Sequence, residues 1–113
     1  MDKTVILRKW CGKVATERAA EYARYMTETG GEDLQTLPGN LGYQIITRDL
    51  GDGTTEITAL SWWTDMEAIK EFVGDEPERA HYYTVDEIYL IDPPQFVEHH
   101  TVMSGDITMR RGG

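Results

Sequence analysis

Hydrophobic and polar residues alternate along three extended segments of the chain. Residues 4–11, TVILRKWC, carry apolar groups on both faces, and Gly12 is expected to end this strand. Residues 41–48 and 55–63 show a similar extended pattern, and the Asp-Gly sequence between them is typical of a hairpin turn. The pattern therefore predicts one N-terminal strand and a later antiparallel pair.

The segment after the first strand has helical spacing. Thr16 is a candidate N-cap, and the pair Gly30-Gly31 is expected to stop the helix. The apolar positions that share one face at this spacing are Ala19, Tyr22, Ala23 and Met26. We expect a helix here, followed by a loop that leads into the second strand.

A second helix is predicted after the third strand. Thr64 followed by Glu67 forms a capping-box pattern, and Gly74 is expected to interrupt the helix. Its predicted buried face consists of Ala68, Ile69, Phe72 and Val73.

The last third of the chain is predicted to return to the sheet. Pro77 suits the first turn of a short helical piece over residues 78–81. Residues 87–91 are predicted as the fourth strand, which an Asp-Pro-Pro sequence breaks before residues 96–102 resume an extended pattern. Residues 103–113 are interpreted as a C-terminal tail.

The predicted order β-α-β-β-α-β indicates an α+β, ferredoxin-like sandwich in which both helices cover one face of a four-stranded antiparallel sheet. The 113 residues fit one domain, over residues 1–102, followed by the tail. Strands one and three carry large apolar residues on both faces, so the face without helices would expose them in a monomer. We therefore expect a homodimer packed sheet to sheet.

Composition limits the classes of binding partner and the cellular compartments that we expect for this protein. The net charge of −9 and the lack of a Lys/Arg stripe disfavour nucleic-acid binding. No apolar run approaches the roughly 18 residues of a membrane span, and the N-terminus leaves no room for a signal peptide. Cys11 is the single cysteine, which excludes an intrachain disulfide and a multi-cysteine metal site. We expect a cytoplasmic protein with no membrane partner.

The stretch LSWWTDMEAIKEFVGDEPERAHYY, followed by EIYLIDPPQFVEHHTV, resembles the antibiotic biosynthesis monooxygenase-type domains of the dimeric α/β-barrel superfamily. The shared features are a tryptophan that ends strand three, a capped xEAIxxF helix, a piece that ends in aromatic residues, and a final VEHxxV strand. The resemblance covers residues 4–102. It implies a dimer with facing sheets, and in each subunit a pocket that holds a flat aromatic ligand or haem.

The resemblance also suggests particular site residues. Cofactor-free oxygenases of this family use an asparagine, a tryptophan and a tyrosine; Trp63 matches the tryptophan, whereas Ala59 and Ile69 stand at the other two positions. Haem-degrading members use an asparagine in strand one and a helix histidine that binds iron. His81 falls near that histidine, but the single asparagine of the chain, Asn40, precedes strand two.

His81 is the candidate catalytic base, because histidine exchanges protons near neutral pH. The alternative is a structural role, in which its imidazole caps the end of the short helix. The predicted ligand-binding residues are Arg8, Trp10, Tyr25, Trp62, Trp63, Tyr82 and Tyr83. For the aromatic members the alternative is packing, and Trp62 and Trp63 should point to opposite faces of the sheet.

Two further interpretations concern charged groups. Arg8 either pairs with a carboxylate of the ligand or with an acidic residue across the sheet. His99 and His100 are adjacent on an extended segment and point to opposite faces, so no metal site is predicted.

The favoured function is oxidation of a small aromatic or polyketide-like molecule without a cofactor. The alternatives are haem binding or degradation with His81 as ligand, and a non-enzymatic module that binds a small ligand.

Overall fold

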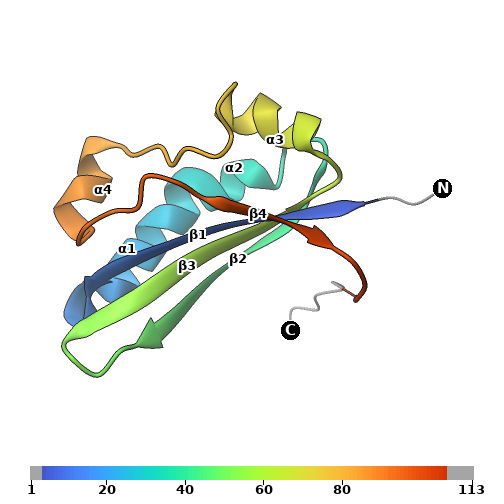
Figure 1. Cartoon of the computed structure of the whole chain (residues 1–113). Coiled ribbons are helices and arrows are strands. Elements are labelled where there is room, and N and C mark those ends of the chain that lie inside the picture. The colour runs from blue at the N-terminus through green and yellow to red at the C-terminus, as the bar shows by residue number, and fades with distance from the viewer. Residues whose placement is uncertain (1–3, 107–113) are drawn as a thin grey trace.

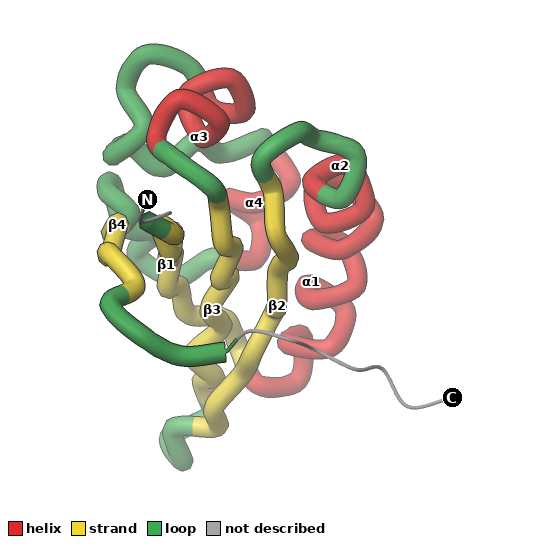
Figure 2. The backbone as a smooth tube through the Cα atoms, turned by 90° about the vertical axis from the view of Figure 1, so that its right-hand side faces the viewer, coloured by secondary structure: helices red, strands yellow, loops and turns green. Residues whose placement is uncertain are grey.

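The computed structural model describes residues 4–106. The strands are β1 (Val5–Ala15), β2 (Asn40–Asp49), β3 (Thr54–Trp63) and β4 (Glu98–Val102). The helices are α1 (Ala19–Met26), α2 (Glu32–Leu34), α3 (Met66–Val73) and α4 (Thr84–Tyr89), with a 3₁₀ turn at Thr16–Arg18 and a π-helical turn at Thr27–Gly31. The strands pair antiparallel in the order β2-β3-β1-β4. All four helices lie on one side of the sheet (Figures 1 and 2). The ferredoxin-like prediction is therefore confirmed.

Strand β1 is longer than predicted, because Gly12 does not end it. The strand continues to Ala15 and pairs with β3 along its whole second half. A Cβ atom at residue 12 would lie 2.4 Å from the ring of Trp10, so the glycine makes room for the indole. The glycine marks a close approach of a side chain to the backbone and not a turn.

The pair Gly30-Gly31 does not stop the first helix either. The chain continues through the π-helical turn directly into α2. A Cβ atom at residue 31 would lie 2.7 Å from the ring of Tyr43, which packs on this turn from β2. Thr16 is not an N-cap, since its hydroxyl instead accepts a hydrogen bond from Thr55 in β3.

Helix α3 has the predicted position but a different cap. Asp65, and not Thr64, accepts a hydrogen bond from the backbone N–H of Ala68 at 2.9 Å. Gly74 ends the helix with a φ of 96°, as the sequence predicts. The helix packs on the sheet through Ile69, which is fully buried.

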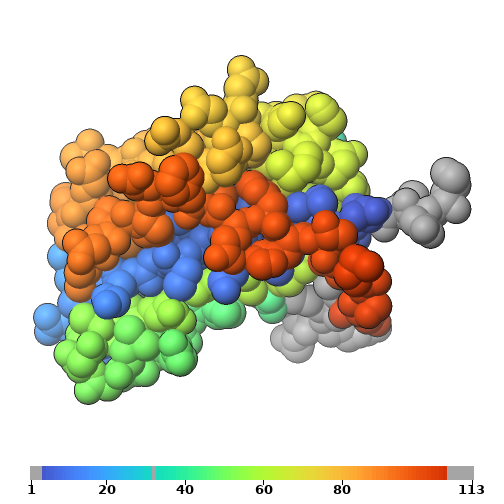
Figure 3. Space-filling model, viewed as in Figure 1, coloured from blue at the N-terminus to red at the C-terminus, as the bar shows by residue number. Residues whose placement is uncertain are grey.

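The predicted fourth strand at residues 87–91 is wrong, since most of this segment belongs to α4. The fourth strand of the sheet is instead β4, inside the extended segment predicted at 96–102. The helical piece predicted at residues 78–81 is also absent. A turn ends at Glu78, Arg79 then forms an isolated antiparallel bridge with Phe96, and the Val97 N–H donates to the Glu78 carbonyl at 2.8 Å. Figure 3 shows this part of the chain, yellow to orange-red, running along the side of β1.

A buried carboxylate explains why α4 begins where it does. Asp86 is 8% exposed and accepts hydrogen bonds from the backbone N–H of Tyr83 at 2.7 Å and from the hydroxyl of Tyr22 at 2.8 Å. The first bond satisfies a free N–H at the helix start, and the second ties α4 to α1. These contacts outweigh the strand propensity of the isoleucine and tyrosine that follow.

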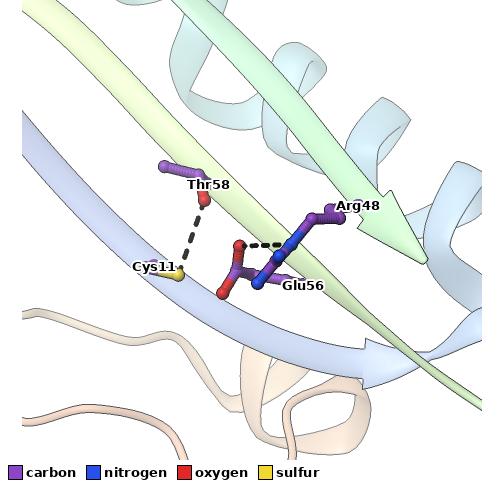
Figure 4. A network of polar contacts seen from close by, with 4 residues as sticks. All are labelled: Cys11, Arg48, Glu56 and Thr58. Atoms are coloured by element: carbon purple, nitrogen blue, oxygen red, sulfur yellow. Dashed lines mark hydrogen bonds and ion pairs between the residues drawn. The ribbon is translucent and has the colours of Figure 1, made fainter. Parts of the chain in front are cut away.

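The two faces of the sheet differ. The face toward the helices carries the core, formed by Val14, Tyr22, Ile57 and Leu90. The outer face mixes apolar side chains, such as the 47% exposed Ile46, with polar contacts. Figure 4 shows two of these contacts: the hydroxyl of Thr58 lies 3.5 Å from the sulfur of Cys11, and Arg48 pairs with Glu56 at 3.5 Å. The first four residues of the predicted tail, 103–106, follow β4 without helix or strand, and residues 107–113 lie outside the described residues.

Candidate functional site

A cavity of about 440 Å³ lies between the inner face of the sheet and the helical layer. Its size is typical of sites that bind small molecules. Exposed residues such as His81 and Tyr83 stand at its mouth. The walls are formed by Arg8, Trp10, Tyr22, Tyr25, Met26, Thr29, Gly30, Gly31, Asp33, Leu34, Tyr43, Ile45, Ala59, Leu60, Ser61, Phe72, Val73, Ala80, His81, Tyr82, Tyr83, Asp86 and Val97.

Aromatic rings dominate one wall and are held by hydrogen bonds. The indole N–H of Trp10 donates to the hydroxyl of Tyr82 at 2.9 Å, and that hydroxyl donates to the carbonyl of Pro94. The two rings meet edge to face, with centroids 6.3 Å apart. Burial raises the pKa of Tyr82, so its hydroxyl stays protonated at neutral pH. This wall offers flat apolar surfaces at fixed positions.

A second wall is formed by stacked tyrosines from α1. The rings of Tyr22 and Tyr25 are stacked 5.9 Å apart, and Tyr22 donates to Asp86. Burial, followed by the hydrogen bond to this carboxylate, raises the pKa of Tyr22 well above its ordinary value. Burial likewise raises the pKa of Tyr25. Neither phenol is therefore suited to act as a base at neutral pH.

Arg8 places a positive charge in the cavity wall. Its Nη1 atom donates to the carbonyl of Pro77 at 2.5 Å and lies 3.0 Å from Nε2 of His99. Among the side chains that the structure describes, no carboxylate forms an ion pair with it, and the expected acidic partner across the sheet is not found there. Burial lowers the pKa of Arg8 to about 10, which still leaves it protonated at neutral pH.

His99 is the group that Arg8 meets across the strand pair. Burial, and then the charge of Arg8, hold the pKa of His99 below its ordinary value. The neutral imidazole can accept a hydrogen bond from the guanidinium through Nε2. Arg8 is therefore fixed by two neutral acceptors, which leave its charge uncompensated.

His81 lies at the mouth of the cavity on a segment without helix or strand. The structural alternative of a helix cap is wrong, because no helix ends at this residue. Tyr82 turns inward and Tyr83 outward, where it is 71% exposed. The imidazole of His81 is therefore both exposed to solvent and part of the cavity lining.

The two tryptophans of β3 do not line the cavity. Trp63 is fully buried, stacks on Phe72 of α3 with ring centroids 5.5 Å apart, and donates its N–H to the Ser61 hydroxyl at 2.8 Å. Trp62 is its neighbour on the strand and points to the outer face. A direct ligand contact in this cavity is therefore expected for neither. Ala59 lies in the cavity wall and Ile69 in the core, so neither supplies the polar group that the family resemblance implies there.

Sequence reasoning missed several polar residues of the cavity, among them Ser61 and Asp86. Asp86 had a signal, since an acidic residue three positions after a helix start is a capping pattern. Ser61 had none, because its role depends on contacts across the sheet. Among the described residues, no three His, Cys, Asp or Glu side chains gather closely enough to hold a metal ion. In the same range, no helix has the length and hydrophobicity needed to cross a membrane.

No protein-family model matches the chain, and no curated protein sequence matches it significantly. Solved structures do match. A candidate antibiotic biosynthesis monooxygenase from Bacillus cereus is 16% identical, with a TM-score of 0.62, over 95% of this chain and 100% of that one. The chain has the fold of the antibiotic biosynthesis monooxygenase-type proteins. The resemblance in the sequence is thus confirmed at the level of the fold.

Two other matches with this monooxygenase-type fold differ in function. The haem-degrading protein MhuD from Mycobacterium tuberculosis, solved with two haems in its active site, is 14% identical with a TM-score of 0.61. That match covers 92% of this chain and 99% of the other. A variant of SnoaB, a cofactor-independent oxygenase from Streptomyces nogalater, is also 14% identical, with a TM-score of 0.57 over 94% and 97% of the two chains. At such identities the likeness shows the fold alone.

Proposed function

We propose that the protein binds a planar hydroxyaromatic molecule in this cavity and oxidises it with O2 without a cofactor. The observation that carries the proposal is the cavity itself, which combines aromatic walls, a histidine at the mouth and a cation within. The neutral tyrosines and the Trp10–Tyr82 pair hold a flat ring system, and His81 is the base within reach of it.

The reaction needs only O2 as oxidant. The imidazole of His81 takes a proton from a ring methylene that the hydroxyl groups activate, and the resulting carbanion forms a C–O bond to O2. The peroxide gains a proton, the second methylene proton leaves, and the O–O bond breaks. One oxygen atom remains as a carbonyl and the other leaves as water, with all four electrons supplied by the substrate.

Oxygen uptake with a panel of hydroxyanthrones tests the proposal. We expect uptake with equimolar quinone product in the absence of metal and flavin. His81→Ala should lower kcat by about 100-fold, the lower range for a lost general base. His100→Ala serves as the control, because His100 is an exposed histidine of β4 outside the cavity wall. If His81→Ala and the wild type consume oxygen at equal rates, His81 is not the base.

A second candidate is haem binding with His81 as iron ligand. Its support is that His81 places an imidazole at the mouth of a cavity with aromatic walls. When bound, haem would supply redox chemistry, while His81 would hold the iron and the aromatic walls would hold the flat ring. Titration of haem into the protein should then give a Soret shift that His81→Ala loses. Absence of a shift at micromolar haem would end this candidate.

The third alternative, a module that binds a ligand without catalysis, is separated by the same experiments. Tight binding of a hydroxyanthrone with no oxygen uptake would identify it. Such a result would support ligand binding in the cavity and rule out the proposed oxidation.

We also propose a homodimer that pairs the outer faces of two sheets, in the cytoplasm. The support is the apolar part of this face, which includes Ile46 and Trp62. Equilibrium sedimentation should give twice the chain mass. A species of 12.9 kDa at micromolar concentration would refute the pairing. The single cysteine is consistent with a reducing compartment.

A further inference from the structure

We propose that the ligand of the cavity carries a carboxylate, and that Arg8 and Ser61 bind this group together. The inference deepens the proposed function, because it rests on the cavity holding an aromatic ligand. It narrows the ligand class to aromatic carboxylic acids and fixes which end of the molecule enters the cavity near β1 and β3.

The first part of the subsite is the guanidinium of Arg8. Its Nη1 atom contacts Pro77 and His99, while Nε and Nη2 have no partner among the described residues. Every fully buried side-chain nitrogen or oxygen among the described residues has a hydrogen-bond partner. Because Nε and Nη2 of Arg8 have none, these two atoms are not fully buried. Arg8 lines the cavity. The Nε and Nη2 edge is one that binds both oxygens of a carboxylate.

The second part is the hydroxyl of Ser61. Ser61 is the cross-strand partner of Arg8, which places their Cβ atoms about 5 Å apart on the same face. It is 7% exposed and lines the same cavity. Its oxygen accepts the indole N–H of Trp63 at 2.8 Å, which leaves its own O–H to donate. Both residues therefore present donors on the cavity side of the sheet, from neighbouring strands.

The surroundings favour a carboxylate over a more highly charged anion. Among the described side chains that line the cavity, Arg8 is the only lysine or arginine. One guanidinium balances one negative charge, whereas phosphate sites add a second cation or a helix N-terminus. The buried carboxylate of Asp86 in the same lining, whose two oxygens already accept hydrogen bonds, would repel further negative charge. The protein as a whole carries a charge of −9, so an anion would enter only for a local reason such as Arg8.

Binding of anthracene carboxylate and its neutral carboxamide, followed by the fluorescence of the ring, tests the inference. The two probes have nearly the same shape and differ in charge. We expect the wild type to bind the carboxylate roughly tenfold to a hundredfold more tightly, the ratio expected for a charge-assisted pair in a partly buried site. The preference should shrink as salt is added.

Variants then assign the preference to the subsite. Arg8→Gln should remove it while leaving carboxamide binding within about threefold of the wild type, and Arg8→Lys should keep part of it. Arg24→Gln is the matched control, since Arg24 is an exposed cation on α1 outside the cavity wall. It makes the same change in net charge and should leave both affinities unchanged.

The outcomes separate the inference from the proposed function. Equal wild-type affinity for the two probes, or a preference that survives Arg8→Gln, would overturn the carboxylate subsite while the cavity and its chemistry stand. Binding of neither probe would overturn both. Because the comparison of the two probes uses the wild type, the inference remains testable even if Arg8→Gln does not fold.

Discussion

The buried hydrogen bond between Tyr22 and Asp86 should account for a measurable share of the stability. It joins α1 to α4 at 2.8 Å, and the two residues are 2% and 8% exposed. The substitution Tyr22→Phe removes only the hydroxyl and leaves the ring in the core. Asp86 then keeps the backbone N–H of Tyr83 as its one remaining hydrogen-bond donor.

The magnitude follows from the nature of this bond. A hydrogen bond to a carboxylate contributes about 1.5–3 kcal/mol, and a buried oxygen that loses its partner retains its desolvation cost. We expect the free energy of unfolding to fall by about 2 kcal/mol. For a domain of this size, that corresponds to a decrease in Tm of roughly 8 °C.

Urea denaturation, with circular dichroism as the signal, measures the change, and the m-value should stay constant. Tyr43→Phe is the matched control, because the hydroxyl of Tyr43 forms no hydrogen bond in the described part of the chain. It should change the free energy of unfolding by less than about 0.5 kcal/mol. If Tyr22→Phe costs no more than this control, the bond between α1 and α4 does not stabilise the fold.

Three further changes test other features. Gly12→Ala should destabilise the protein by about 1–3 kcal/mol, because the added Cβ displaces the Trp10 ring; an unchanged urea midpoint would contradict this. Asp65→Ala should cost about 1 kcal/mol through the lost cap of α3, again measured with urea. The pKa of His99 is lowered in the folded state, so the unfolded chain binds its proton first and stability falls as the pH drops below about 6.5. His99→Gln should flatten this decline in urea midpoints measured between about pH 7 and pH 5, and a parallel decline would show that burial of His99 beside Arg8 does not cause it.

The sequence predicted the fold because its strongest local signals agree with it. The hairpin has Asp-Gly turn chemistry, and Gly51 and Gly53 adopt φ angles of 84° and 91°. The second helix ends at Gly74 as expected. These features depend on neighbouring residues alone, which is why they are visible without the structure.

The errors lie where distant contacts decide the structure. Residues 87–91 have the composition of a strand, but Asp86 and Tyr22 stabilise a helix there. Gly12 and Gly31 look like terminators, yet each accommodates an aromatic ring from elsewhere in the fold. The partners of Arg8 come from residues 69 and 91 positions away, so its lack of an acidic partner could not be predicted from the sequence.

The π-helical turn at Thr27–Gly31 makes the size of the cavity sensitive to chain length. Such a turn is wider than an α-helical one by one residue. Deleting a residue there would restore α-helical spacing and rotate the following segment by about 100° about the helix axis. Asp33 and Leu34, which line the cavity, would then leave its wall. Insertions and deletions in this segment, more than substitutions, are therefore the changes by which related chains would come to accept ligands of different size.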